Sequence, residues 1–205
     1  MILYPNIYLD NIKKITFELL EKNNIKGLIL DIDNTIIDYD KNILEGTESW
    51  CNNLKQQGIK MCILSNTNKV QKVKKVAEKL KLKYLYFAHK PSKKGFRKAM
   101  QILELKPENI AVVGDQIFTD VYGGNRSKMF TILIKPIDTR DIWLTRLKRP
   151  FEKIVLKKYL KGVEKNEPVK NTPHRHHRIQ LRILKGFLHK QAWLLRHQRK
   201  LPSGA

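Results

Sequence analysis

Residues 27–35 read GLILDIDNT, and this stretch decides the fold. Its first four residues are a short apolar run that ends directly on Asp31 and Asp33. Such a run, closed by turn-forming residues, is typical of a buried strand. Two carboxylates this close together repel each other unless a cation binds, and Mg²⁺ in proteins is held by one or two carboxylates together with substrate phosphate. The stretch therefore predicts a nucleophile at Asp31, an acid/base at Asp33 and a bound cation.

Composition narrows the class of protein. The 205 residues suffice for one domain with a real core, and the net charge of +22 favours anionic partners: nucleic acid, acidic lipid headgroups or phosphorylated substrates. Lysines that only fill solvated faces are the alternative, with equal weight. Cys51 and Cys62 form neither a disulfide framework nor a zinc pattern, which favours a reducing cytosol. The first residues, with Pro5 and Asp10 and no long apolar core, are not expected to form a signal peptide, and no apolar run approaches the roughly 18 residues that cross a bilayer. We expect a cytoplasmic protein that can lie at the inner face of the cell membrane.

The rest of the chain alternates between strands and helices, after an amphipathic helix expected within residues 1–25. This alternation predicts an α/β fold, a Rossmann-like three-layer sandwich around a mainly parallel five-stranded sheet. The strands are expected at residues 26–31, 59–64, 84–88, 110–113 and 130–134.

Polar residues follow four of these strands at the point where each ends. In an open parallel sheet, ligands bind outside the carboxyl ends of the strands, so these residues are expected to meet at one site. They are Asp31 and Asp33, Ser65 and Asn66, Lys90, and Asp115 and Asp120.

Together these residues supply the parts of a phosphoryl transfer, which needs positioning and charge neutralisation. Asp31 would attack the phosphorus and form an aspartyl-phosphate. Asp33 would protonate the leaving oxygen and then take a proton from water. Ser65, or the backbone near Asn66, would donate to a phosphoryl oxygen, and Lys90 would neutralise developing charge.

The expected cation is Mg²⁺, and the expected substrate contacts lie beside it. Asp115 would complete the magnesium site with Asp31 and the main-chain carbonyl of Asp33, while Asp120 would bind the ion through water or orient the other ligands. Thr35 and Asn66 are the residues expected to contact substrate.

Each cluster also has a structural explanation. DIDNT fits a turn in which Asp and Asn bond their own backbone, and Ser65 fits a helix cap. Lys90 is one of several nearby lysines, among them Lys93, and GDQIFTD at residues 114–120 fits a loop with a helix cap. The order and placement of all four clusters together favour the catalytic interpretation.

With these motifs the chain resembles the phosphatases of the haloacid dehalogenase superfamily over roughly residues 25–135. DIDNT resembles their first motif, Ser65 their second, Lys90 their third and GDQIFTD their fourth. An aspartate at position 33 resembles the phosphatases rather than the dehalogenases of this superfamily. The resemblance implies a Mg²⁺-dependent phosphomonoester hydrolase.

A narrower resemblance rests on GLILDIDNT, AHKPSKKGFRKA and VVGDQIFTDVYGGNR. Together they resemble the phosphatidylglycerophosphate phosphatase family. The resemblance supports Lys90 over Lys93 as the motif lysine, and it implies hydrolysis of phosphatidylglycerophosphate to phosphatidylglycerol in phospholipid biosynthesis.

Two features bear on a lipid substrate. The intervals from Asp33 to Ser65 and from Ser65 to Lys90 leave no room for a cap domain, so the site suits a substrate held by a membrane, a protein or a polynucleotide. Residues 137–165 carry Trp, Phe, Leu and Ile at helical spacing among basic residues, with Pro150 in the first turn of a second helix. Such helices bind anionic lipid, or alternatively pack on the sheet with a solvated basic face.

Three segments follow from these patterns: residues 1–136 as the phosphatase core with its N-terminal helix, residues 137–165 as the basic amphipathic helices, and residues 166–205 as a tail. The tail holds five of the six histidines and one acidic residue. It is a disordered basic arm, an amphipathic helix over residues 179–195, or a sequence artefact, and it receives no catalytic role.

The leading prediction is a phosphatase for a phosphorylated lipid headgroup at an anionic membrane surface. A phosphatase acting on nucleic-acid ends or phosphoproteins is the second enzyme hypothesis. A non-catalytic RNA- or ribosome-binding protein on the same scaffold is the third, and the intact set Asp31, Asp33, Lys90 and Asp115 argues against it. Nucleic acid is therefore a less favoured partner.

Overall fold

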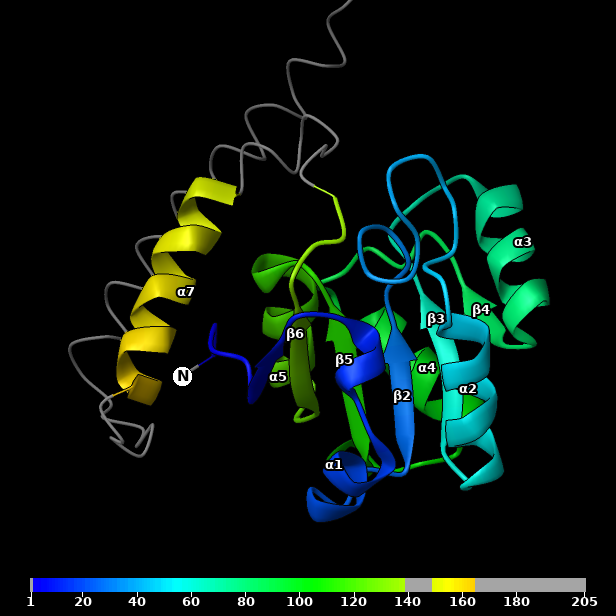
Figure 1. Ribbon diagram of the computed structural model, residues 1–205, viewed down its shortest axis with the longest axis horizontal. Helices are drawn as coiled ribbons and strands as arrows, with labels where there is room; N and C mark the ends of the chain where they lie inside the picture. The colour runs from blue at the N-terminus through cyan, green and yellow to red at the C-terminus, as the bar shows by residue number, and fades with distance from the viewer. Residues whose placement is uncertain (1, 139–148, 165–205) are drawn as a thin grey trace, which may run out of the picture. The chain divides into compact units, whose positions relative to one another are not determined.

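The computed structural model describes residues 2–138 and 149–164 of the chain (Figure 1). The chain divides into two units. The described part of the first unit is residues 2–138, and that of the second is helix α7, Arg149–Glu164, so each is described by itself.

The first unit is built on one parallel sheet, in the order β1-β6-β5-β2-β3-β4. Every neighbouring pair of strands is parallel. The predicted parallel α/β fold is confirmed, but the sheet has six strands rather than the expected five. The strands are β1 (Ile7–Leu9), β2 (Gly27–Leu30), β3 (Lys60–Leu64), β4 (Lys83–Leu85), β5 (Ile110–Gly114) and β6 (Phe130–Ile134).

The sixth strand comes from the N-terminal segment, where a helix was expected. In place of one helix within residues 1–25, the structure has β1, a short 3-10 turn (η1, Ile12–Lys14) and α1 (Phe17–Lys22). Two caps divide the segment: the Asn11 side chain accepts from the N–H of Lys13, and Thr16 accepts from the N–H of Leu19. The buried residues of this segment are divided accordingly: Ile12 lies on η1, Leu20 lies on α1, and Ile15 lies between the two elements.

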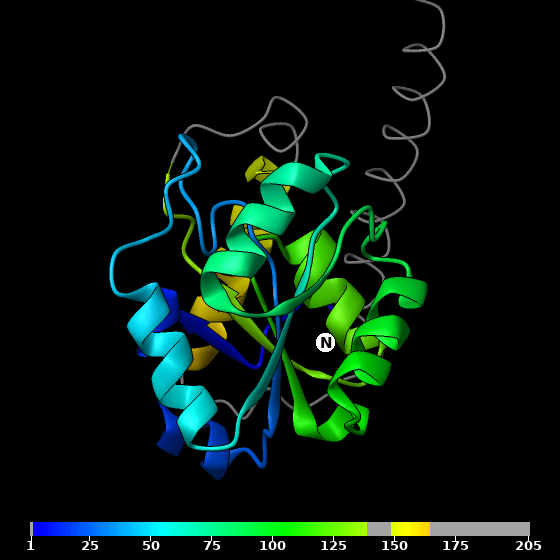
Figure 2. The same ribbon diagram turned by 90° about the vertical axis from the view of Figure 1, so that its right-hand side faces the viewer.

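Helices cover both faces of the sheet and complete the predicted three layers, as Figure 2 shows. On one face lie η1, α1, α2 (Thr47–Gln56) and α3 (Val70–Leu80); on the other lie α4 (Lys93–Leu103) and α5 (Tyr122–Arg126). Successive residues of a strand point to opposite faces. In β2, Leu28 and Leu30 accordingly pack with the first group of helices, and Ile29 with the second.

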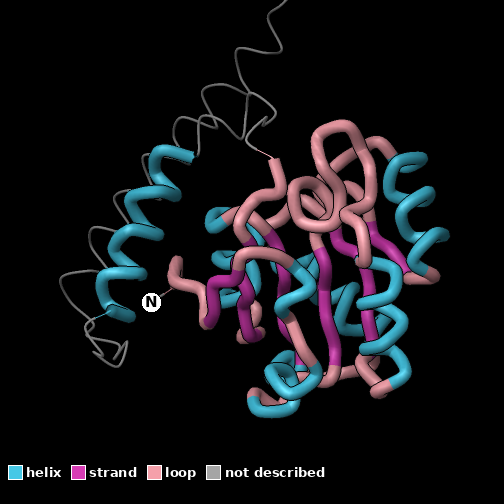
Figure 3. Tube along the Cα trace, viewed as in Figure 1, coloured by secondary structure: helices cyan, strands magenta, loops and turns pink. Residues whose placement is uncertain are grey.

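The largest departures from the predicted boundaries lie at the carboxyl ends of the strands, where the loops gather (Figure 3). β4 ends at Leu85, three residues early, because the chain turns through left-handed conformations at Phe87 and His89 (φ 49° and 53°). Beyond β5, a π-helical turn at Ile117–Val121 precedes α5. A π turn inside a helical segment is frequent at functional sites.

Helix α7 represents the second unit, and Pro150 lies in its first turn. Its lysines are exposed, as are the apolar residues Ile154 and Val163, whereas Val155 and Tyr159 are buried. The rest of the predicted apolar stripe, Trp143 and Leu147, lies outside the described residues, as does the tail at residues 166–205. None of the described helices is long and apolar enough to cross a bilayer.

Candidate active site

Asp31 lies directly beyond the carboxyl end of β2, in the middle of the sheet. Its N–H donates to the carbonyl of Val113 at 2.9 Å, so the backbone remains paired with β5 up to this residue. Its side chain is only 8% exposed. Strand pairing on both sides of β2 thus fixes the predicted nucleophile where four strands end.

Lys90 joins two of the predicted carboxylates. Its Nζ donates to Asp31 Oδ1 and to Asp120 Oδ1, each at 2.7 Å, and its side chain is 3% exposed. Lys93, by contrast, is exposed at the first position of α4. The geometry therefore places Lys90, the residue that the resemblance favoured, in the cluster.

Asn66 holds Lys90 in place through its backbone. The Asn66 amide nitrogen donates to the Lys90 carbonyl at 3.0 Å, and the Lys90 N–H donates to Asn66 Oδ1 at 2.6 Å. Both ends of the amide are thus used within the protein, which gives Asn66 a positioning role that the sequence did not reveal. Its expected contact with substrate stays a prediction.

Ser65 and Thr35 are both buried beside the strand ends. Ser65 Oγ accepts from the N–H of Thr67 at 3.3 Å, and the Ser65 N–H donates to the Leu85 carbonyl of β4 at 3.0 Å. The Thr35 hydroxyl is buried and has no hydrogen-bond partner among the described residues. Their roles toward phosphate and substrate stay predictions.

Three buried carboxylates form a candidate metal site. Asp31, Asp115 and Asp120 each present an oxygen within 4.8 Å of the other two. Asp120 was expected to bind only through water or to orient other ligands, and the structure brings its carboxylate into the cluster itself. The Asp33 carboxylate does not belong to this group. The ligand atom predicted for Asp33 is its main-chain carbonyl, and this stays a prediction.

The loop after β5 is shaped to bring Asp120 inward. The carboxylate of Asp120 accepts from the N–H of Gln116 at 3.2 Å and from Thr119 Oγ1 at 3.3 Å, both through Oδ2. A Cβ atom at position 114 would collide with this carboxyl group, so only glycine lets Asp120 approach β5 so closely. This explains in physical terms why the motif at residues 114–120 begins with glycine.

Burial and like charge shift the protonation of the cluster. Burial raises the pKa of Asp31 to about 7; Lys90 opposes this rise, while Asp120 and Asp33 add to it. For Lys90, burial by itself lowers the pKa, but the carboxylates of Asp120 and Asp31 outweigh it and raise the pKa above its ordinary value. The lysine is therefore charged at neutral pH, whereas Asp31 takes up a proton easily unless another cation is present.

The side chains at the site suit a divalent ion. Three buried carboxylates, those of Asp31, Asp115 and Asp120, lie close enough together to bind one ion. Lys90 pairs with Asp31 and Asp120, and Lys72 pairs with Asp33. Carboxylate oxygens are also the ligands that Mg²⁺ prefers. The residues present therefore suit a bound magnesium ion.

Lys72 is a site residue that sequence reasoning missed. Its Nζ lies 2.5 Å from Asp33 Oδ1, and the side chain is 13% exposed. Nothing in the sequence separates it from the other lysines of α3.

The loop after Asp33 is tied to the end of the first unit. Asn34, in a left-handed conformation (φ 58°), accepts from the N–H of Ile137 through its carbonyl at 3.2 Å. Its side-chain Oδ1 accepts from the N–H of Asp138 at 3.3 Å. The side chains of DIDNT thus contact α3, Lys90 and the segment after β6, beyond the local turn that was the alternative explanation of this stretch.

No cap domain interrupts the described residues around the site. Between β2 and β3 the chain forms one loop and α2, and between β3 and β4 it forms only α3. This agrees with the spacing of the motifs in the sequence.

Comparison with known proteins places this geometry in a family. A Bacillus subtilis protein named "Probable phosphatase YqeG" is 40% identical over 153 residues, which are 74% of this chain and 88% of that protein. The family model of the haloacid dehalogenase-like hydrolases matches residues 39–127, a segment that contains Ser65, Lys90, Asp115 and Asp120. The chain belongs to the haloacid dehalogenase-like hydrolases. The resemblance drawn from its motifs is thereby confirmed at the level of the superfamily.

Solved structures show more distant similarity. The p-nitrophenyl phosphatase of Archaeoglobus fulgidus is 17% identical with a TM-score of 0.44, covering 61% of this chain and 92% of its own. The cobalt-bound deoxy-D-mannose-octulosonate 8-phosphate phosphatase of Haemophilus influenzae is 14% identical with a TM-score of 0.46, covering 68% of this chain and 92% of its own.

Proposed function

We propose that this hydrolase is a Mg²⁺-dependent phosphatase that dephosphorylates phosphatidylglycerophosphate to phosphatidylglycerol, through an aspartyl-phosphate on Asp31. The observation that carries the phosphatase proposal is the position of Lys90 Nζ, 2.7 Å from both Asp31 and Asp120, in a buried cluster that also holds Asp115. A cationic donor beside a buried carboxylate nucleophile suits a reaction that concentrates negative charge. The Bacillus subtilis relative, named "Probable phosphatase YqeG", supports a phosphatase as well.

The residues of the site divide the reaction between them. Asp31 attacks the phosphorus and the phosphate ester bond breaks, so the phosphoryl group passes to the aspartate oxygen. Asp33 gives its proton to the leaving alcohol and later accepts one from the water that hydrolyses the aspartyl-phosphate. Lys90 neutralises the phosphoryl oxygens, and Ser65 donates to one of them. Bound Mg²⁺, held by Asp31 and Asp115 with Asp120, would supply further charge neutralisation at those oxygens.

A lipid substrate is supported by the sequence and by the open architecture. The three motif stretches resemble the phosphatidylglycerophosphate phosphatases, and no cap is inserted between the described motifs. Helix α7 exposes Lys153, Lys157 and Lys158 together with Ile154, a combination that suits an anionic membrane surface. We place the protein in the cytoplasm, at the inner face of the membrane that contains its substrate.

The proposal is tested by phosphate release from three substrates with Mg²⁺ present: phosphatidylglycerophosphate, a phosphorylated oligonucleotide and a phosphopeptide. We expect the lipid to be hydrolysed fastest, and Asp31→Asn to abolish release. Preference for the oligonucleotide or the phosphopeptide would replace the lipid assignment with the second enzyme hypothesis. Full activity of Asp31→Asn would overturn the nucleophile, and no release from any substrate would favour a non-catalytic RNA-binding role.

A further inference from the structure

The exposed aromatic residues of the first unit lie at the active-site edge of the sheet. Among its described residues, the large hydrophobic side chains that stand exposed are Tyr39 (52%), Tyr86 (48%) and Phe87 (54%). Tyr39 follows β2, and Tyr86 and Phe87 follow β4, so all three lie beyond carboxyl ends of parallel strands. Single exposed apolar residues are ordinary on a protein surface, but their confinement to the edge that holds Asp31 is not.

The loop between β4 and α4 presents its aromatic residues on an ordered backbone. Phe87 donates its N–H to the Thr67 carbonyl at 2.9 Å, and the next residue, Ala88, donates to Ser65 at 3.0 Å. Phe87 adopts a left-handed conformation (φ 49°), which is rare for a bulky residue and is kept only where its surroundings fix it. Its ring is therefore held outside by the same loop that leads to Lys90.

Tyr39 stands on a second ordered turn. Asp38 accepts from the Asn42 N–H at 2.8 Å and from the Asn42 side-chain amide at 3.2 Å, which closes a tight turn over residues 38–42. Tyr39 and Lys41 lie inside this turn and are exposed. Two separate turns, each fixed by its own hydrogen bonds, thus expose aromatic rings at the same edge.

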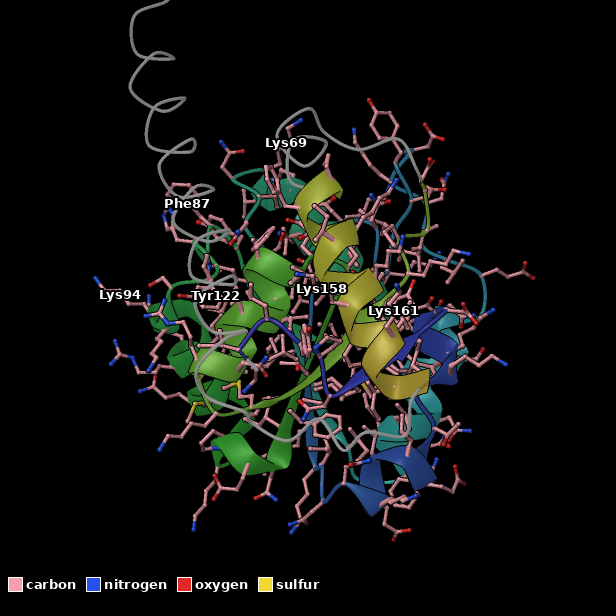
Figure 4. All side chains as sticks on the ribbon, turned by 90° about the vertical axis from the view of Figure 1, so that its left-hand side faces the viewer. Lys69, Phe87, Lys94, Tyr122, Lys158 and Lys161 are labelled. Atoms are coloured by element: carbon pink, nitrogen blue, oxygen red, sulfur yellow. The ribbon has the colours of Figure 1, made fainter. Side chains whose placement is uncertain are left out.

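Exposed lysines lie in the same turn as Tyr39 and at the starts of the helices at this edge. Lys69 is exposed at the start of α3, beside Thr67, and Lys94 is exposed at the start of α4. Figure 4 labels Phe87, Lys69 and Lys94. We name this surface the rim face; it consists of Tyr39, Lys41, Lys69, Tyr86, Phe87 and Lys94.

We propose that the rim face docks on an anionic lipid bilayer and presents the active-site aspartates to the headgroups. Aromatic rings with a polar edge lie at the level of headgroups, and lysines near a surface of anionic lipid are attracted to it. This inference rests on the proposed function, because it places the same site against the lipid that would be hydrolysed.

A nucleic acid fits this surface less well. The rim cations are lysines, point charges that mobile headgroups can meet in any orientation, whereas recognition of a polynucleotide favours the planar fork of arginine. The Phe87 ring also packs against His89, with ring centres 4.1 Å apart in an edge-to-face arrangement, which leaves less of it for stacking on a base.

The test measures which face of the full-length protein contacts lipid vesicles that contain no substrate. The native cysteines, Cys51 and Cys62, are buried, so a polarity-sensitive fluorophore can be attached to single introduced thiols. Phe87→Cys and Tyr39→Cys place it on the rim face, and Gln101→Cys places it on an exposed position of α4 away from that face as a matched control. Phosphatidylglycerol vesicles, phosphatidylcholine vesicles and a single-stranded oligonucleotide are the three additions.

We expect phosphatidylglycerol vesicles to shift the emission of the labels at positions 87 and 39 to the blue. The shift of the label at position 101 with the same vesicles should be at least threefold smaller. The shifts of the labels at positions 87 and 39 with phosphatidylcholine vesicles should be smaller by the same factor. Equal shifts at all three positions, or none, would overturn the docking of this face. A response to the oligonucleotide alone would assign the face to nucleic acid. Because no substrate is present, this outcome is separate from the phosphatase assay: a rim-specific shift without any hydrolysis would overturn the proposed function, but not the docking.

Discussion

Lys72 Nζ lies 2.5 Å from Asp33 Oδ1, so a lysine of α3 holds the predicted acid/base by an ion pair. The two residues stand 39 positions apart in the sequence, Asp33 in the loop after β2 and Lys72 on α3. Because the side chain of Lys72 is 13% exposed and that of Asp33 is 36% exposed, solvent screens the pair only in part. In the proposed mechanism, Lys72 therefore positions the group that would exchange protons with substrate and water.

Replacing Lys72 with glutamine should lower kcat/KM by about tenfold, which corresponds to about 1.4 kcal/mol, because Asp33 loses the partner that orients it. Steady-state hydrolysis of a phosphate ester measures this change. Lys75→Gln, an exposed lysine of the same helix, is the matched control and should leave kcat/KM unaltered. If the pH profile of kcat/KM changes in Lys72→Gln but not in Lys75→Gln, the effect comes from the positioning of Asp33 and not from a loss of helix stability. Equal effects of the two variants on kcat/KM would contradict the positioning role of Lys72.

Lys90→Met should reduce kcat by at least about a hundredfold, since removing one preorganised donor to developing charge has effects of this size. The measurement is single-turnover phosphate release with saturating Mg²⁺, and circular dichroism checks that the variant folds. Lys93→Met changes a neighbouring exposed lysine and should retain activity. Loss of activity in Lys93→Met with retention in Lys90→Met would exchange the two assignments.

Mg²⁺ should bind more weakly as the pH falls below about 7. Without the cation the pKa of Asp31 is raised to about 7, so a proton occupies the carboxyl group below that pH and competes with the metal. The thermal shift of the protein at several Mg²⁺ concentrations between pH 5.5 and pH 8.5 would measure the affinity for Mg²⁺. Asp115→Asn should weaken Mg²⁺ binding at every pH. An affinity for Mg²⁺ that does not depend on pH would contradict the assignment of Asp31 as a metal ligand.

The same shift sets the pH dependence of stability in the metal-free protein. The pKa of Asp31 is higher in the folded protein than its ordinary value of 3.8, so its protonated form stabilises the fold at low pH. This contribution is lost as the pH rises from about 4 to about 7. Denaturant midpoints of the chelated protein should reveal the loss, and Asp31→Asn should remove this part of the pH dependence.

The two cysteines should be inert in the folded protein. Burial raises the pKa of Cys51 to about 11 and that of Cys62 to about 12, so neither forms a thiolate at neutral pH. A colorimetric thiol reagent should therefore find no reactive group in the native protein and two after denaturation. Rapid reaction of either thiol under native conditions would contradict its packing.

The features of the fold that follow from the periodicity of apolar residues, and from the position of polar residues at strand ends, could be predicted from the sequence. The apolar run before Asp31 identified the central strand, and the polar residues after the other strands meet around Lys90 because parallel strands share one carboxyl edge. Strand β1 was missed because its three residues are too few for a period-2 pattern to stand out against the helical spacing that follows.

The contacts within the site could not be predicted in the same way. Lys72 and Asn34 act through tertiary contacts with segments far along the chain, and no local pattern distinguishes them from solvated lysines or turn residues. The π-helical turn around Asp120 likewise depends on how closely that carboxylate approaches Gly114. Such features follow from the packed structure and not from the spacing of residues in one segment.

The two hydrogen bonds between Asn66 and the backbone of Lys90 link the loops after β3 and β4 into one rigid piece. The ammonium group of Lys90 then needs little reorganisation when charge develops on a phosphoryl group, because its ordering was completed when the protein folded. Because the two loops are connected in this way, a substitution in one of them should also disturb the other. The effects of Asn66→Ala and Lys90→Met in a double-mutant cycle would therefore be expected to fall short of their sum.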